Sequence, residues 1–282
     1  MSWWQALILG LVEGVTEYLP VSSTGHLILA ERALGIVRTP ASDAYAICIQ
    51  AGAIVAVLGL YRERVIQMLR GLMGRDGAGL RLLVNLFVAF LPAAVLGFLF
   101  DDLVEELLFG LWPVVFAWGV GGLVILGFRA RVTAAQADTV RVGASAPGTL
   151  DDITWKTALI IGFAQCLALW PGTSRSLATI LGGVLVGLSM GAAVEFSFLL
   201  GLLTLGAATS YAGIKHADEL LAAYGPVEMG LGFLMAMVSA AISVKWLVGW
   251  LQSHGMGVFA GWRLGLAAVV AALLLTGHLA PT

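Results

Sequence analysis

Long runs of hydrophobic residues dominate this chain, and only short polar segments separate them. A helix needs about 20 predominantly apolar residues to cross the hydrocarbon core of a bilayer. Six runs approach that length, so we expect six transmembrane helices. They lie near residues 44–61, 82–100, 112–129, 190–213, 226–250 and 258–279.

Two further apolar regions, 2–34 and 154–188, are interrupted midway by proline among small and polar residues. The first break lies at Pro20 and the second at Pro171 and Gly172. Broken helices at membrane depth are tolerated only where they are buried in protein or line a wet cavity. We therefore predict that both regions are re-entrant helix pairs.

The composition agrees with this pattern. Of the 282 residues 60% are hydrophobic and 11% are charged, and the mean hydropathy is +0.96. A water-soluble domain needs a more polar surface, so we expect an all-α integral membrane protein with one membrane domain over residues 1–282. The net charge of −2 gives no reason to expect a nucleic-acid partner.

Neither end of the chain nor the cysteines change this picture. The N-terminus has no basic region and no small-residue cleavage site, so we expect no removable signal peptide. Cys48 and Cys166 lie inside apolar runs and are expected to be buried without a disulfide.

The distribution of arginine predicts the orientation in the membrane. Loops 62–81 and 129–156 are basic, whereas segment 101–111 between them contains acidic residues and no Lys or Arg. Basic loops favour the cytoplasmic side, which leaves both termini outside. Lys245 and Arg263 then fall at cytoplasmic helix ends, and Lys215 is an external exception. The basic residues of the two loops are Arg62, Arg64, Arg70, Arg75, Arg81, Arg129, Arg131, Arg141 and Lys156, and the acidic residues of segment 101–111 are Asp101, Asp102, Glu105 and Glu106.

This orientation makes the two halves, about 1–130 and 151–280, an inverted-topology repeat. Each half has one re-entrant pair followed by three spans, and the two breaks should meet near the midplane. Both breaks carry a proline, a central serine and small polar neighbours. Tryptophans near span ends are expected to mark the membrane interfaces; they are Trp3, Trp4, Trp112, Trp250 and Trp262.

Two carboxylates precede the first break. Glu13 and Glu17 are four residues apart and share one face of a helix. Inside lipid, two such carboxylates cost several kcal/mol unless a cation, a proton or a polar partner compensates. A divalent metal ion or one shared proton is the economical explanation, and a hydrated helix end is the alternative.

Hydroxyl groups and a histidine follow the proline of the first break. Ser22, Ser23 and Thr24 could cap the returning helix or contact a substrate. His26 comes three residues after Ser23, where it could act as a general base or as a nucleophile. The alternative for His26 is a packing residue with satisfied hydrogen bonds.

The second break contains Arg175, an always-charged guanidinium at membrane depth that needs an anionic partner. Its planar fork suits two phosphate oxygens, and Thr173, Ser174 and Ser176 beside it could complete an anion site at a helix N-terminus. An internal ion pair with Glu13 or Glu17 is the alternative. Two polar residues within spans, Gln50 and Glu195, either support the site or hydrogen-bond between helices.

These segments resemble the undecaprenyl-diphosphate phosphatase family, the bacterial membrane enzymes associated with bacitracin resistance. The resemblance extends over nearly the whole chain. It rests on Glu13-Gly-Val-Thr-Glu17-Tyr-Leu-Pro-Val-Ser-Ser-Thr-Gly-His26 and Ala168-Leu-Trp-Pro-Gly-Thr-Ser-Arg-Ser176, with Ile49-Gln50-Ala-Gly and Glu195-Phe-Ser-Phe-Leu-Leu in support.

The resemblance implies hydrolysis of undecaprenyl diphosphate to undecaprenyl phosphate and inorganic phosphate, which recycles the lipid carrier of peptidoglycan synthesis. It implies a bacterial cytoplasmic membrane, a site open to the exterior, and dependence on a divalent cation, Mg²⁺ or Ca²⁺, for which Glu13 and Glu17 offer oxygen ligands. The functional residues it carries over are Glu13, Glu17, Ser23, His26 and Arg175.

We expect Arg175 and a cation to neutralise the diphosphate, while Ser23 attacks with His26 as base, or His26 attacks itself. The main alternative is a lipid transporter or flippase, because inverted repeats with broken helices are also a carrier architecture. An intramembrane serine protease would leave Arg175 and both glutamates unexplained. The sequence leaves open whether the chain forms a homodimer.

Overall fold

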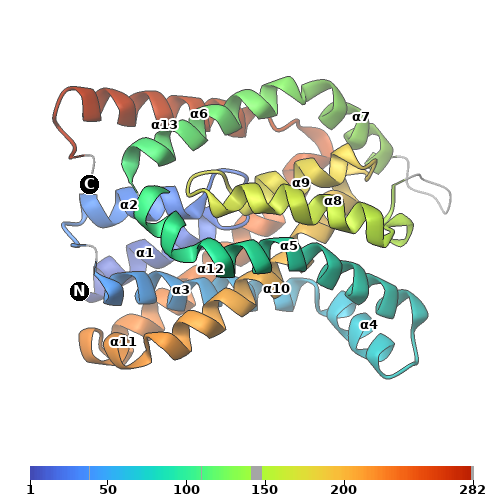
Figure 1. The fold of residues 1–282 in the computed structure, drawn as a ribbon, viewed down its shortest axis with the longest axis horizontal. Helices are drawn as coiled ribbons and strands as arrows, with labels where there is room; N and C mark the ends of the chain where they lie inside the picture. Colours follow the sequence, from blue (N-terminus) through green and yellow to red (C-terminus); the bar gives the residue numbers. More distant parts are fainter. Residues whose placement is uncertain (38, 109, 141–147, 281–282) are drawn as a thin grey trace.

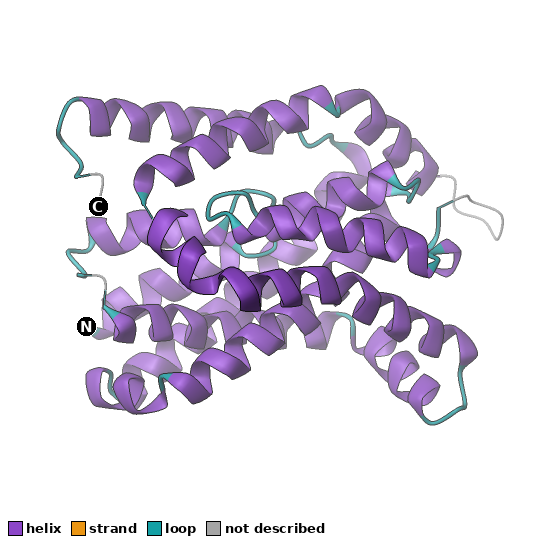
Figure 2. Cartoon of the chain, viewed as in Figure 1, coloured by secondary structure: helices purple, strands orange, loops and turns teal. Residues whose placement is uncertain are grey.

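The computed structural model describes residues 1–37, 39–108, 110–140 and 148–280 (Figure 1). Across these ranges every regular element is a helix and none is a strand (Figure 2). Arg141 lies outside the described residues, and so do the side chains of Asp101, Asp102 and Glu105.

Helices long and apolar enough to cross a membrane occur where the hydrophobic runs predict them, so the chain is an integral membrane protein. Five are single helices, and a sixth span is completed if α6 and the helix after it, which bend by 60°, count as one. The helices are α3 (Pro40–Leu60), α5 (Gly77–Leu108), α6 (Leu111–Gly127), α7 (Arg129–Val140), α10 (Met190–Lys215), α12 (Pro226–Ser253) and α13 (Gly257–Leu275).

Local sequence signals determine where several of these helices begin. Thr39 caps α3, and its hydroxyl accepts a hydrogen bond from the Ser42 backbone N–H, while Ser189 caps α10 in the same way. Proline occupies the first turn of α3 and of α12, where its missing N–H costs nothing.

Each of the two interrupted apolar regions folds as a pair of short helices that are separated at the predicted break. The first pair is α1 (Trp3–Thr16) and α2 (Ser23–Ala33). The second is α8 (Trp155–Cys166), extended by the short 3-10 turn η2 (Leu167–Leu169), and α9 (Arg175–Leu185). With 11 to 14 residues each, these helices are too short to cross a bilayer alone.

The two breaks end in the same backbone conformation. Ser22, which precedes α2, has a φ of 75°, and Ser174, which precedes α9, has a φ of 76°. They are the only non-glycine residues with positive φ among the described residues. Residues other than glycine rarely adopt this backbone conformation. Both serines therefore occupy a strained turn, which the surrounding contacts must stabilise.

One helix of each short pair packs against a long helix from the other half of the chain. α1 lies along α12, which also contacts α3, and α8 lies along α5, while α6 and α13 pack together along the upper edge of Figure 1. The α1–α12 contact is close, because a Cβ added to Gly10 would lie 2.3 Å from the Gly232 carbonyl oxygen. Small residues permit such backbone contact in membrane proteins.

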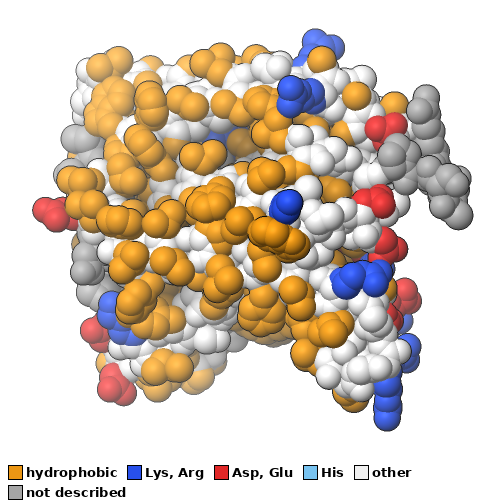
Figure 3. Space-filling view, turned by 45° about the vertical axis from the view of Figure 1, so that its right-hand side comes forward, with side chains coloured by type: hydrophobic (Ala, Val, Ile, Leu, Met, Phe, Trp, Pro, Cys, Tyr) orange, Lys and Arg blue, Asp and Glu red, His pale blue; other side chains and the backbone are white. Residues whose placement is uncertain are grey.

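The outer surface is banded. Hydrophobic side chains cover the middle of the face in Figure 3, and charged side chains gather toward the two ends. The basic loop helix α4 (Arg62–Leu72) and α7 lie at one end, while both termini and α11 (Ala217–Ala223) lie at the other (Figure 1). This separation agrees with the arginine pattern of the sequence.

Candidate active site

The two breaks meet in the middle of the helical body, where their loops lie side by side (Figure 2). The Ser176 hydroxyl donates a hydrogen bond of 3.0 Å to the Leu19 carbonyl oxygen, which joins the second break to the first. Arg175 Nη2 donates to Glu17 Oε1 at 3.0 Å across the same junction. The expected meeting of the two polar segments is therefore present.

Side chains satisfy the backbone of the first break. Four successive carbonyl oxygens each accept a hydrogen bond from a different side chain, and the first and last of them also accept one from a backbone N–H. An unsatisfied backbone group in a membrane costs several kcal/mol, so these side-chain donors stabilise the break. The carbonyls belong to residues 19–22, and their donors are, in order, Ser176, Arg263, Trp118 and His26.

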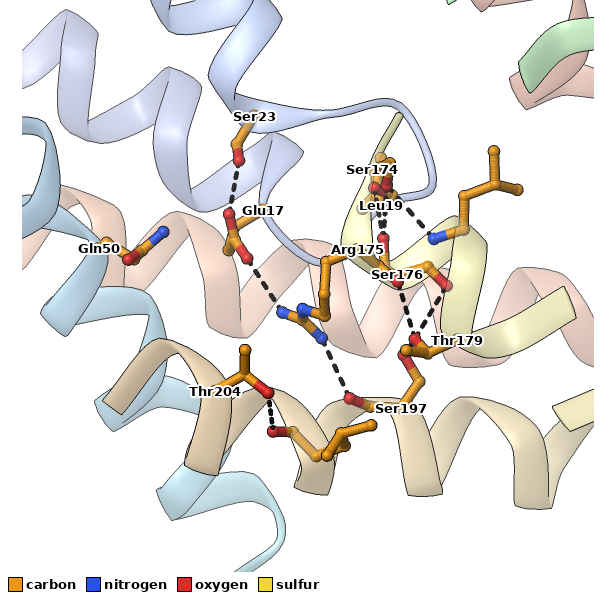
Figure 4. A network of polar contacts seen from close by, with 12 residues as sticks. Glu17, Leu19, Ser23, Gln50, Ser174, Arg175, Ser176, Thr179, Ser197 and Thr204 are labelled. Carbon is orange, nitrogen blue, oxygen red and sulfur yellow. Dashed lines mark hydrogen bonds and ion pairs between the residues drawn. The ribbon is translucent and has the colours of Figure 1, made fainter. Parts of the chain in front are cut away.

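One carboxylate lies at the centre of the site (Figure 4). Glu17 Oε2 accepts a hydrogen bond of 2.5 Å from the Ser23 hydroxyl, and Glu17 Oε1 pairs with Arg175. Glu17 is 6% exposed. A hydroxyl of the first break and a guanidinium of the second are therefore both within hydrogen-bonding distance of the same small anionic group.

Arg175 is held by contacts on several sides. Its Nη1 donates to the Ser197 carbonyl oxygen at 3.0 Å, and its guanidinium lies 5.2 Å from the centre of the Tyr18 ring. A Cβ on Gly201 of α10 would lie 2.5 Å from Nη1, so only glycine leaves room for the guanidinium. The sequence identified Arg175 but gave no sign of Gly201.

Glu13 is the second carboxylate of the pair and is 1% exposed. Its Oε1 atom has no hydrogen-bond partner in the described structure. Gln50 contacts the Glu13 carboxyl and accepts a hydrogen bond of 3.3 Å from Thr209 on α10. Gln50 therefore supports the site, whereas Glu195, its counterpart in the other half, forms an ion pair with Arg64 at 2.8 Å.

His26 is not bonded to Ser23. Its Nδ1 lies 2.6 Å from the Ser22 carbonyl oxygen and therefore carries the proton, while its Nε2 accepts a hydrogen bond of 2.9 Å from the Trp262 indole N–H. Both ring nitrogens are occupied, and the Ser23 proton points to Glu17 instead. Trp262, expected to mark a membrane interface, is a hydrogen-bond donor to this histidine.

Arg263 corrects another expectation. The arginine pattern placed it at a cytoplasmic helix end, but it is fully buried, with 0% exposure. Its guanidinium donates to the carbonyl oxygens of Pro20, Ala117 and Gly172. Positional rules for arginine concern loops and cannot detect an arginine whose partners are backbone carbonyls from remote segments.

The hydroxyls of the second break bond within the protein rather than forming an open cradle. Ser174 Oγ accepts from the Leu177 N–H, which caps α9, and lies 2.9 Å from Ser176 Oγ. Ser176 in turn bonds Leu19, as described above. Thr173 remains half-buried at the turn. Of the expected phosphate-binding hydroxyls in this break, Ser174 and Ser176 thus have structural partners.

A cavity of about 680 Å³ opens beside the first break. Ser23, Thr24, Glu13 and Gln50 line its inner part, whereas Ser22 is not among its lining residues. Lys215 and His216 also line it, at the end of the molecule where both chain termini lie (Figure 1). The candidate nucleophile Ser23 and the Glu13 carboxylate therefore line a cavity that extends to one end of the protein.

The acidic pair is small for a metal site. Within the described ranges, no cluster of three or more Asp, Glu, His or Cys side chains is arranged to hold a metal ion. Glu13 and Glu17 remain the carboxylates from which a hard cation could take oxygen ligands, and the orphaned Oε1 of Glu13 fits that use.

Comparison with known proteins gives matches over almost the whole chain. The family model described as bacitracin resistance protein BacA matches residues 6–269. Undecaprenyl-diphosphatase of Ectopseudomonas mendocina is 45% identical over 268 residues, which is 95% of this chain and 92% of the relative. Undecaprenyl-diphosphatase of Nitrosomonas europaea is 43% identical, covering 97% and 94%, and undecaprenyl-diphosphatase 2 of Rhodospirillum rubrum is 44% identical, covering 97% and 95%.

Proposed function

The chain belongs to the bacitracin resistance protein BacA family, and from this premise we propose that it hydrolyses undecaprenyl diphosphate to undecaprenyl phosphate and inorganic phosphate. Relatives that share about 45% of its residues over nearly their full length carry the name undecaprenyl-diphosphatase. The same activity explains an association with cell-wall synthesis and bacitracin resistance.

One observation carries the proposal. The Glu17 carboxylate bridges the Ser23 hydroxyl and the Arg175 guanidinium deep inside a membrane protein. A terminal phosphate has anionic oxygens at a similar spacing and can take the place of the carboxylate against Arg175. The guanidinium then stabilises the phosphoryl group while the hydroxyl stands next to it, as phosphoryl transfer requires.

The proposed reaction begins when a phosphate oxygen displaces Glu17 from Arg175. The released carboxylate accepts the Ser23 proton, and Ser23 Oγ attacks the terminal phosphorus. The bond from that phosphorus to the bridging oxygen breaks, and undecaprenyl phosphate leaves with the proton that Glu17 accepted. Water then hydrolyses the phosphoserine, which releases inorganic phosphate and restores the hydroxyl. The hydrogen bond between Ser23 and Glu17 supports Glu17 as the base.

His26 is the rival for both chemical roles. As base or nucleophile it would first have to lose the hydrogen bond that its Nε2 accepts from Trp262. The contacts in the structure favour a role for His26 in orienting Ser23, because its Nδ1–H donates to the carbonyl oxygen of the preceding residue, Ser22. A covalent label on His26 would reverse this assignment.

A divalent cation, Mg²⁺ or Ca²⁺, is part of the proposal. Glu13 and Glu17 would hold it through carboxylate oxygens, and Mg²⁺ in particular is often bound by one or two carboxylates together with substrate phosphates and water. When bound, the cation supplies positive charge that offsets the diphosphate. Support comes from the acidic pair and from the unpartnered Oε1 of Glu13.

We further propose an inverted-topology repeat in the bacterial cytoplasmic membrane, with the cavity open to the exterior. Three features support it: the matched φ angles of Ser22 and Ser174, the packing of each short pair against a helix of the other half, and the basic loops at the end opposite the cavity mouth. Transport of lipid is not part of the proposal, because neither the family description nor the relatives' names point to it.

The test is phosphate release by the purified protein from a polyprenyl diphosphate in the presence of Mg²⁺ or Ca²⁺. We expect the wild type to be active, Ser23→Ala to lose activity, and Ser253→Ala, an exposed serine at the end of α12, to retain it. An inactive wild type would refute the proposed phosphatase activity. An active Ser23→Ala variant would refute the role of Ser23 as the nucleophile.

A trapping experiment distinguishes the nucleophile. Rapid acid quenching after mixing with substrate labelled in the terminal phosphate should leave label on Ser23, because phosphoserine survives acid. Label that is lost in acid but kept in base points to His26. No label on either residue at any time would remove covalent catalysis.

A further inference from the structure

Arg263 is a buried cation that the reaction described above does not use. It lies on α13, its exposure is 0%, and among the described residues no carboxylate forms an ion pair with it. Burial of a charge without an opposite charge costs several kcal/mol, and a hydrophobic side chain of similar size would avoid that cost. The position therefore requires a specific reason for a guanidinium.

The hydrogen bonds of Arg263 supply that reason. Nη1 donates to the Pro20 carbonyl oxygen at 3.3 Å, in the first break. Nη2 donates at 2.9 Å to the Gly172 carbonyl oxygen, in the second break, and at 2.9 Å to the Ala117 carbonyl oxygen of α6. One rigid fork thus connects both breaks and a long helix.

Each of the two carbonyls that Arg263 holds lies three residues before a residue of the proposed reaction. Ser23 follows Pro20 by three residues, and Arg175 follows Gly172 by three residues. A fixed distance between the two carbonyls therefore fixes the nucleophile of one break relative to the phosphate clamp of the other. No other side chain described here bonds the backbone of both breaks.

We propose that Arg263 is a positioning residue that aligns Ser23 with Arg175 by holding Pro20 and Gly172 together. The proposal rests on the proposed phosphatase function. It explains why a planar fork occupies a dry position: two nitrogens fixed on one rigid carbon donate to carbonyls of different segments, whereas a lysine offers one nitrogen on a flexible stem.

The neighbouring residue of α13 contacts the same site. Trp262 donates its indole N–H to His26 Nε2, and the two rings stack with centres 6.0 Å apart. Consecutive residues of one helix thus hold His26 and both breaks. No residue of α13 is among the described residues that line the cavity, so this helix acts on the site through His26 and the two breaks.

Glycine substitutions on α6 test the proposal while leaving Arg263 in place. A Cβ on Gly121 would lie 2.1 Å from Arg263 Nη2, so Gly121→Ala must displace the guanidinium. A Cβ on Gly119 would have no atom within 4 Å, so Gly119→Ala is a matched control on the same helix. Arg263→Lys is the second variant, which keeps the charge and removes the fork.

Steady-state hydrolysis of a polyprenyl diphosphate by purified wild type and variants gives kcat and KM separately. A misplacement of about 1 Å can cost 10²-fold in rate, so we expect kcat to fall about 100-fold in Gly121→Ala and Arg263→Lys. KM should change less than about threefold, because the substrate's lipid and diphosphate contacts remain. Gly119→Ala should match the wild type in both constants.

Three outcomes overturn the proposal. Wild-type kcat in Gly121→Ala or in Arg263→Lys shows that the fork does not align the site. Equal losses in Gly119→Ala and Gly121→Ala show a general effect of α6. Failure of both Arg263→Lys and Gly121→Ala to yield folded protein, with Gly119→Ala folded, assigns Arg263 to folding alone. An inactive wild type refutes the proposed function instead. That result is distinct from the three above, which all require an active wild type.

Discussion

Glu17 has two contacts in the structure that the reaction must rearrange. Its carboxylate forms an ion pair with Arg175 and accepts a hydrogen bond from the Ser23 hydroxyl. In the proposed reaction, a phosphate oxygen takes the place of Glu17 Oε1 on Arg175, while Glu17 Oε2 stays beside the Ser23 hydroxyl.

Glu17→Gln should lower kcat by about 10²- to 10⁴-fold, the usual contribution of a positioned base. The amide still accepts a hydrogen bond from Ser23 but cannot take its proton. Phosphate release by the purified variant measures the effect. Glu195→Gln is the matched control, because Glu195 also pairs with an arginine, Arg64, away from the breaks; near-normal activity of Glu17→Gln would contradict the assignment of Glu17 as base.

Arg175→Lys should lose about 10- to 100-fold in kcat/KM, since a hydrogen bond to a charged group contributes about 1.5–3 kcal/mol. An ammonium keeps the charge but cannot contact a phosphate and the Ser197 carbonyl through separate nitrogens of a fork. Arg64→Lys, in the Glu195 ion pair, controls for loss of a guanidinium elsewhere. Wild-type rates in Arg175→Lys would remove this side chain from the phosphate site.

At the scale of the helices, glycine permits the close contacts that place the short pairs. α1 approaches α12 at Gly10 so closely that a Cβ would lie 2.3 Å from the Gly232 carbonyl oxygen. Backbone cannot rotate aside as a side chain can. The position of Glu13 and Glu17 near the end of α1 therefore depends on the α1–α12 contact.

Gly10→Ala should destabilise the protein by about 1–3 kcal/mol, the usual cost of overpacking a well-packed interface. Gly230→Ala is the control on α12, because a Cβ there would have no atom within 4 Å. Thermal unfolding of both variants in detergent, at equal protein concentration, compares them. Equal melting temperatures for Gly10→Ala and the wild type would show that α1 can move away from α12 at no cost.

At the scale of the whole molecule, a hydrophobic band separates two charged ends (Figure 3). The cavity opens at the end that carries Lys215 and both termini, and the basic helices lie at the other end. In the proposed orientation, a lipid diphosphate of the outer leaflet presents its headgroup to Ser23 from that end. This geometry ties the location of the substrate to the orientation of the protein.

Cysteine labelling tests the orientation in whole cells. In a background with Cys48→Ala and Cys166→Ala, a membrane-impermeant thiol reagent should label Lys215→Cys and should not label Arg75→Cys until the cells are permeabilised. Both positions are exposed, charged residues in the wild type, so accessibility within the protein is comparable. The reverse pattern would place the cavity on the cytoplasmic side.

The lengths of the hydrophobic runs and the prolines that interrupt two of them determined the helical class, the positions of the spans and the two breaks. These features depend on local chemistry: apolar runs cross lipid as helices, and proline among polar residues interrupts them. Glu13, Glu17, Ser23 and Arg175 could also be identified, because charged or polar groups within apolar segments are costly enough to be conspicuous.

Tertiary structure decided which of these residues touch. Ser23 bonds Glu17 instead of His26, and His26 bonds Trp262, because the turn at Ser22 and the approach of α13 orient the side chains. Arg263 reaches carbonyls that lie 91 to 243 residues away along the chain. The sequence contains these residues, but hydrogen bonds between remote segments depend on distances that only the packed helices establish.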